Sequence, residues 1–80
     1  MTWILHGIAP DGSSWGYTDP LGQTWWASTN WPPRPATVEG LRRYAVYAGW
    51  DRCERTFEGP DAIVAYRHAM MAYRPAEGPL

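Results

Sequence analysis

Hydrophobic residues gather in three short runs over the first third of the chain. The runs are Thr2–Ala9 (TWILHGIA), Ser14–Thr18 (SWGYT) and Gln23–Ser28 (QTWWAS), and they are rich in aromatic and β-branched residues. Pro10-Asp11-Gly12 separates the first two runs as a turn signal. Asp19-Pro20-Leu21-Gly22 separates the next two and suits a type I turn. The pattern predicts a three-stranded antiparallel meander.

A proline-rich stretch and then a helical pattern follow this meander. Asn30–Pro35 (NWPPRP) contains three prolines, which lack the N–H donor, so we expect an extended connector that joins no strand ladder. After it, apolar residues recur at helical spacing. This stripe consists of Val38, Leu41, Ala45 and Ala48. Thr37 suits the N-cap, and Gly49 suits the left-handed position that ends a helix.

The last third of the chain predicts a second helix. Arg52–Phe57 (RCERTF) alternates enough for a short strand, with a loop as the alternative. Gly59-Pro60-Asp61 opens a helix that we expect to run to about Tyr73 and to end before Pro75. Residues 1–74 would form one compact domain, and residues 75–80 (PAEGPL) a flexible C-terminal tail.

The predicted order of elements is β-β-β-α-(β)-α. It indicates an α+β domain in which a small antiparallel sheet packs with two helices. The sheet has three strands in this prediction, with a fourth if residues 52–57 join it. The chain has 80 residues, which leaves no room for a second domain.

The adjacent tryptophans Trp25 and Trp26 must face opposite sides of the predicted sheet. If two or four residues form the preceding loop, Trp15 pairs with Trp26, and Gly16 pairs with Trp25. Trp15, Tyr17 and Trp26 then share one face, while Trp25 lies over the glycine where a helix can pack. A two-layer fold covers one face only, so the other would expose large aromatic rings as an interface. The alternative is that the rings simply fill the core of a small domain.

Composition and charge narrow the classes of partner. The chain has six Trp, five Tyr, no Lys and a formal net charge of −1. Residues 1–33 contain no Lys or Arg, and all seven arginines lie in residues 34–74. We therefore expect no membrane partner, and we see neither a signal peptide nor a run long enough to span a bilayer. The expected location is the cytoplasm of a bacterial host cell.

The sequence shows no motif for catalysis, a metal or a cofactor. His6 and His68 have no flanking ligand pattern, and Cys53 has no base beside it in the sequence. Ser13-Ser14 lacks the context of a nucleophile elbow, and there is no phosphate-binding glycine loop or zinc-ligand spacing. We expect a protein that is not an enzyme and that needs no cofactor.

The stretch Gly16–Trp26 (GYTDPLGQTWW), within a predicted meander followed by a helix, resembles the arm-type DNA-binding domains of phage integrases. The resemblance covers about residues 15–48 and implies a sheet that reads the major groove with basic side chains. This chain departs from that pattern, because its meander has no Lys or Arg to neutralise phosphates. Nucleic-acid binding by an integrase-arm or excisionase-like accessory protein is therefore the alternative function.

In its size, single domain and lack of a catalytic motif, the chain resembles small inhibitors from phages and mobile elements, including anti-CRISPR proteins. The resemblance implies a protein that binds a bacterial protein complex, such as a CRISPR effector, and blocks it. The near-neutral charge disfavours DNA mimicry and favours contact with a protein surface. Self-assembly, with the aromatic face pairing two copies into a homodimer, is a third class.

We predict that the partner surface consists of aromatic anchors and arginines, because Trp, Tyr and Arg dominate interface hot spots. The predicted anchors are Trp15, Tyr17 and Trp26, the rim is Trp31 and Arg34, and the charge partners are Arg67 and Arg74.

Overall fold

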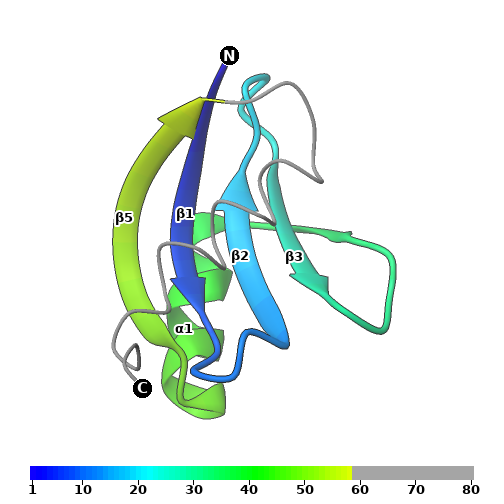
Figure 1. The fold of residues 1–80 in the computed structure, drawn as a ribbon, viewed down its shortest axis with the longest axis vertical. Coiled ribbons are helices and arrows are strands. Elements are labelled where there is room, and N and C mark those ends of the chain that lie inside the picture. Colours follow the sequence, from blue (N-terminus) through cyan, green and yellow to red (C-terminus); the bar gives the residue numbers. More distant parts are fainter. Residues whose placement is uncertain (59–80) are drawn as a thin grey trace, which may run out of the picture.

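The computed structural model describes residues 1–58, which form one five-stranded antiparallel sheet and one helix. The elements in chain order are β1 (Thr2–Ile8), β2 (Ser14–Thr18), β3 (Thr24–Ser28), β4 (Arg34–Ala36), α1 (Val38–Ala48) and β5 (Asp51–Glu58). The strand order across the sheet is β4-β3-β2-β1-β5 (Figure 1). The α+β class is confirmed. The second helix expected from residue 59 and the tail at 75–80 lie outside the described residues.

The meander formed by β1, β2 and β3 is confirmed with nearly the predicted bounds. The stretch from residue 52 to 57 is a strand and not a loop, since it lies within β5 and pairs antiparallel with β1. β5 therefore returns the chain to the far edge of the sheet after α1 has crossed one face (Figure 1).

The proline-rich connector contains one strand that we did not expect. Arg34–Ala36 forms β4, and Pro35 lies opposite Trp25 of β3. The prediction that this stretch joins no ladder is wrong, because β4 is an edge strand of three residues. An edge strand has a ladder on one side only, so it tolerates a residue without an N–H.

Helix α1 begins and ends where its capping residues predict. The Thr37 side chain accepts a hydrogen bond of 3.0 Å from the backbone N–H of Gly40. Gly49 has a φ of 72°, the left-handed conformation that closes a helix at little cost for glycine. Leu41 and Ala45 of the predicted stripe are buried, whereas Val38 is half-buried and Ala48, in the last turn, is exposed.

The sheet has two different faces, which we name by what lies on them. The helix face packs against α1 and Trp50, and Leu41 lies over Gly16 so closely that an added Cβ would be 2.5 Å from Leu41 Cδ1. The opposite face, called the far face, carries a separate cluster. Its buried members are Trp3, Leu5, Ile8, Trp15, Tyr17 and Ala27.

The register between β2 and β3 differs from the predicted one by one residue. Trp15 pairs with Ala27 and Gly16 pairs with Trp26. Asp19 and Gln23 are joined by a backbone hydrogen bond of 2.8 Å, which leaves an odd loop of Pro20, Leu21 and Gly22. Because side chains alternate with a period of two, an odd loop moves Trp26 to the face opposite Trp15. The prediction that Trp15, Tyr17 and Trp26 share a face is wrong.

Candidate functional site

The predicted contact residues lie in three different environments. Trp15 and Tyr17 are buried on the far face, with exposed fractions of 6% and 4%. Trp26 lies on the helix face, while Arg34 follows on β4 and Trp31 lies between them in the connecting loop. The fold thus places Trp26 and Arg34 opposite each other on neighbouring strands and separates them from the other two rings. Arg67 and Arg74 lie outside the described residues.

A cleft of about 580 Å³ opens where β3 and β4 meet the first two turns of α1. The lining residues are Trp26, Arg34, Pro35, Ala36, Thr37, Gly40, Leu41 and Tyr44. Its size falls in the range typical of ligand sites, and aromatic and aliphatic groups dominate its walls. A single arginine supplies the charge.

The aromatic walls of this cleft are held by ring contacts. Tyr44 meets Trp26 edge-on at 6.0 Å between ring centroids and also meets Trp50 edge-on at 5.1 Å. The Arg34 guanidinium carbon lies 6.0 Å from the centroid of the Trp26 ring, at the limit of a cation–π contact. Trp26 is the hub of the cleft, because it touches both the arginine and the helix.

Two polar groups of the cleft lack a partner within the part of the chain that the structure describes. The indole N–H of Trp26 is buried without a hydrogen bond. Arg34 is exposed and forms no ion pair with any carboxylate of residues 1–58. A buried unpaired donor costs about 1–3 kcal/mol, and an exposed guanidinium can bind a carboxylate with two hydrogen bonds.

Large apolar side chains of α1 and of the loop between β3 and β4 are exposed. Trp31 of that loop is 59% exposed, and Tyr47, whose ring lies 5.9 Å from that of Tyr44, is 85% exposed. The place of Trp31 at the rim of a partner surface stays a prediction. Sequence reasoning did not find Tyr44 or Tyr47, because their helical positions fall outside the predicted stripe.

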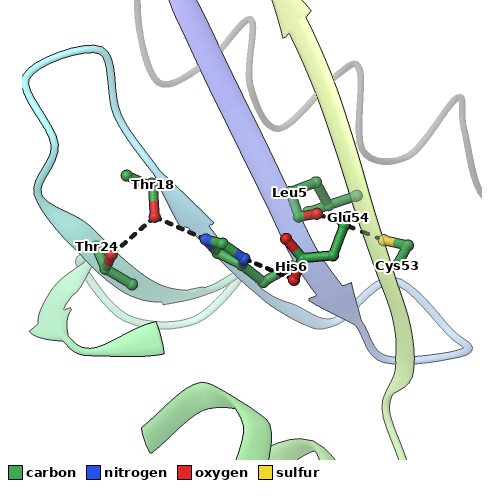
Figure 2. Close-up of polar contacts among 6 residues, drawn as sticks. All are labelled: Leu5, His6, Thr18, Thr24, Cys53 and Glu54. Carbon is green, nitrogen blue, oxygen red and sulfur yellow. Dashed lines mark hydrogen bonds and ion pairs between the residues drawn. The ribbon is translucent and has the colours of Figure 1, made fainter. Parts of the chain in front are cut away.

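A polar row crosses four strands on the helix face, beyond the part that α1 covers (Figure 2). His6 of β1 is at its centre and is 8% exposed. His6 Nδ1 lies 3.0 Å from Glu54 Oε2 of β5, and Nε2 lies 2.7 Å from Thr18 Oγ1 of β2. Thr18 Oγ1 in turn lies 2.7 Å from Thr24 Oγ1 of β3.

A β-bulge in β1 brings His6 to this position. Leu5 pairs with Tyr17 while Gly7 pairs with Gly16, so His6 is an extra residue in that ladder. The order carboxylate, imidazole and hydroxyl matches that of hydrolase triads. Here the Thr18 hydroxyl is also bound to Thr24, so the chain of hydrogen bonds is closed within the sheet. We interpret the row as the means by which a buried histidine is satisfied.

Sequence reasoning found no ligand pattern around His6 and missed its two partners, Glu54 and Thr18, and the Thr24 hydroxyl bound to Thr18. No spacing signal could have found them, because Thr18, Thr24 and Glu54 come from three other strands. Only the pairing of the strands brings them together.

Cys53 lies on the far face beside β1. Its thiol lies 3.7 Å from the carbonyl oxygen of Leu5, and burial raises the pKa of the thiol above its ordinary value. A raised pKa reduces the thiolate fraction at neutral pH and hence the reactivity of the sulfur. The geometry thus favours a half-buried packing role for Cys53 over that of a nucleophile.

Within residues 1–58, no group of three or more His, Cys, Asp or Glu side chains is arranged to hold a metal ion. In the same part of the chain, no helix has the length and apolar character needed to cross a bilayer. Comparison of the chain with protein-family models, with curated proteins and with solved structures found no match. The function must therefore be argued from the site itself.

Proposed function

We propose that this chain is a non-catalytic binding protein that docks on a larger bacterial protein through the cleft around Trp26 and Arg34. The observation that carries the proposal is the union of edge-to-face aromatic rings and an arginine without an ion pair among residues 1–58 in one cleft. Aromatic residues and arginine are the residue types that contribute most to binding energy at protein interfaces.

The lining favours an extended, proline-containing segment of the partner that also carries an acidic residue. Grooves walled by aromatic rings bind such segments, because the extended polyproline conformation is already ordered and its rings stack on Trp and Tyr. Arg34 would pair with the acidic side chain. A backbone carbonyl of the segment would suit the unpartnered indole N–H of Trp26 after a small shift of the rings around it.

The resemblance to anti-CRISPR-type inhibitors leads us to propose that binding inhibits the partner protein. We find no catalytic site within residues 1–58, so the chain would act in the bacterial cytoplasm by covering a surface that its partner needs. The exposed ring of Tyr47, next to Tyr44 of the cleft, would widen the contact. Blockage of a CRISPR effector is the form of this activity that the resemblance implies.

A display library of peptides with fixed prolines and varied flanking residues tests the cleft directly. We expect the full chain to select peptides that combine proline with Asp or Glu. Arg34→Ala should weaken the selected peptide at least about tenfold, which is the effect of losing one charge-assisted hydrogen-bonded pair. The measurement is fluorescence polarisation of the labelled peptide.

Arg43→Ala is the matched control, because it removes the same charge from an exposed position that does not line the cleft. Circular dichroism of both variants shows whether the fold is retained. Equal affinities of the two variants, or selection of peptides without proline or acid, would contradict the proposed ligand.

Capture from a bacterial lysate, with and without nuclease, tests the class of partner. The proposal requires a stoichiometric protein that survives nuclease, is lost with Arg34→Ala and is retained with Arg43→Ala. Capture that disappears with nuclease and weakens steeply with salt would instead favour the alternative of a nucleic-acid-binding accessory protein.

A further inference from the structure

We infer that β5 is a dimerisation strand, on which a second copy of this chain pairs antiparallel to continue the sheet. This inference concerns the edge opposite the cleft and does not depend on the proposed function. It begins from the position of β5. Within residues 1–58, β5 has β1 on one side and no strand on the other (Figure 1).

The two edges of the sheet differ in how they are protected. β4 has three residues and contains Pro35, which are two of the devices by which proteins prevent edge-to-edge pairing. β5 has eight residues and no proline. Its outer backbone groups offer a ladder to another strand, although its ladder with β1 is irregular where Glu54 and Cys53 face the single residue His6. Charged side chains on an edge strand hinder pairing with another strand only where like charges would face each other.

The charges of β5 match a second copy of β5. Residues alternate between the two faces along the strand: Asp51, Cys53 and Arg55 on the far face, and Arg52 and Glu54 on the helix face. An antiparallel pair centred on Cys53 sets Arg52 opposite Glu54 and Asp51 opposite Arg55. Each pair occurs twice, because the twofold axis repeats it.

Neighbouring registers lack this match. A pair centred on Glu54 sets two glutamates opposite each other, and one centred on Arg52 sets two arginines opposite each other. Directly opposed like charges destabilise a strand pair, while opposite charges stabilise it by about 0.2–1 kcal/mol. The sequence of β5 therefore specifies one register for self-pairing.

The same charges have few partners within the chain. Neither Arg52, Arg55 nor Asp51 forms an ion pair within residues 1–58, and all three are exposed. Glu54 bonds to His6 through Oε2, which fixes its side chain on the helix face, where Arg52 of a second copy would lie. The buried histidine thus positions one half of the proposed contact.

Charge reversal on the far face tests this inference in the full chain. Sedimentation equilibrium should show a dimer, twice the 9.1 kDa of one chain, that dissociates in the micromolar range expected for a small interface. Arg55→Asp and Asp51→Arg should each weaken the dimer at least about tenfold, because each sets two like-charge pairs opposite each other. The double variant should restore it.

Oxidative cross-linking tests the register. Cys53 is the only cysteine of the chain, so a disulfide-linked dimer must join two copies of it. In the proposed register the two Cβ atoms lie about 4.5–5.5 Å apart, close enough for a bridge after small adjustments. The double variant Cys53→Ser, Thr56→Cys is the matched control. Its two cysteines would lie about 20 Å apart along the strands and should not cross-link.

A chain that stays monomeric up to about 1 mM, well above the micromolar range of weak complexes, would overturn the inference. So would a dimer that ignores both charge reversals, or one that cross-links through residue 56 as readily as through residue 53. Arg34→Ala should leave the dimer unchanged. The experiments can therefore disprove the dimer without disproving ligand binding by the cleft, and the reverse.

Discussion

Asp19 shows how one side chain can organise a whole turn. Its Oδ1 accepts hydrogen bonds from the backbone N–H groups of Leu21 and Gln23, and its Oδ2 accepts from the indole N–H of Trp25. Burial alone would raise the pKa of this carboxyl, but these hydrogen bonds together lower it below the ordinary value. The charged form of Asp19 is therefore stabilised by folding.

We predict that Asp19→Asn lowers the free energy of unfolding at pH 7 by roughly 1–2 kcal/mol, because hydrogen bonds to a charged acceptor are lost. A lowered pKa in the folded state contributes stability above the unfolded value of about 3.9, and that contribution disappears as pH falls through the folded value. The variant should therefore lose less stability than the wild type below pH 4. Urea denaturation at pH 7 and pH 3 measures both effects. If the variant and the wild type lost equal free energy of unfolding between these pH values, the lowered pKa of Asp19 would not be the source of the pH dependence.

The same turn decides on which face each tryptophan lies. The left-handed Gly22, with a φ of 92°, closes a three-residue loop, and the odd length sets Trp25 with Trp15 and Tyr17 on the far face. Trp26 is left on the helix face with Arg34. A change of one residue in the length of this loop would thus exchange the faces of Trp25, which packs on the far-face core, and Trp26, which lines the cleft.

At the scale of elements, the approach of α1 to the sheet depends on the missing side chain of Gly16. Leu41 fills the space over this glycine and is 3% exposed. A methyl group there would lie 2.5 Å and 2.8 Å from the two terminal carbons of Leu41. The helix can lie this close only because β2 carries a glycine at the crossing point.

We predict that Gly16→Ala destabilises the protein by about 1–3 kcal/mol, the usual cost of overpacking a filled core. A double-mutant cycle with Leu41→Ala checks the cause. The double variant should lose less stability than the sum of the two single changes, because Leu41→Ala removes the atoms that clash. Additive losses would mean that the cost arises elsewhere, for example in the backbone freedom of the glycine.

The two edge strands also act as elements with different roles. β4 is short, contains a proline and carries the arginine of the cleft, whereas β5 is long and self-complementary in charge. A dimer through β5 would place two clefts at the two distant ends of one continuous sheet. A partner with two suitable segments would then bind with higher avidity than either segment alone.

At the scale of the whole molecule, the sheet carries a different row of side chains on each face. The row on the helix face is polar and consists of Glu54, His6, Thr18 and Thr24. The row on the far face is aromatic, with Trp3 stacked on Phe57 at 6.4 Å and tilted against Tyr17 at 5.6 Å. Each row joins strands that are distant in sequence, so both stabilise the sheet as a unit.

We predict that Trp15→Ala lowers the free energy of unfolding by about 3–5 kcal/mol, because it empties a buried site of the far-face core. A small domain has only about 5–15 kcal/mol in total, so this variant should be largely unfolded at modest urea concentrations. Trp31→Ala, at a position that is 59% exposed, is the control and should change stability by less than about 0.5 kcal/mol. Retention of the fold by Trp15→Ala would show that the far-face rings are interface and not core.

The sequence by itself determined most local elements of residues 1–58, with β4 as the exception. The meander followed from its aromatic and β-branched runs and its turn residues, α1 from its caps and apolar stripe, and the strand alternative for residues 52–57 from alternation. These signals are local, because capping, turn formation and periodicity act over a few residues. The sequence also predicted Trp26, Trp31 and Arg34 as residues of a binding surface, which stays a hypothesis; Trp26 and Arg34 line the cleft.

Only the tertiary structure decided which side chains meet. The odd loop set the faces of the tryptophans, and the edge position of β4 allowed its proline. Strand order joined Glu54 to His6, and packing of α1 on the sheet joined Tyr44 to Trp26. Such contacts link residues far apart in the chain. They depend on register and packing, and a shift of one residue in register reverses every face.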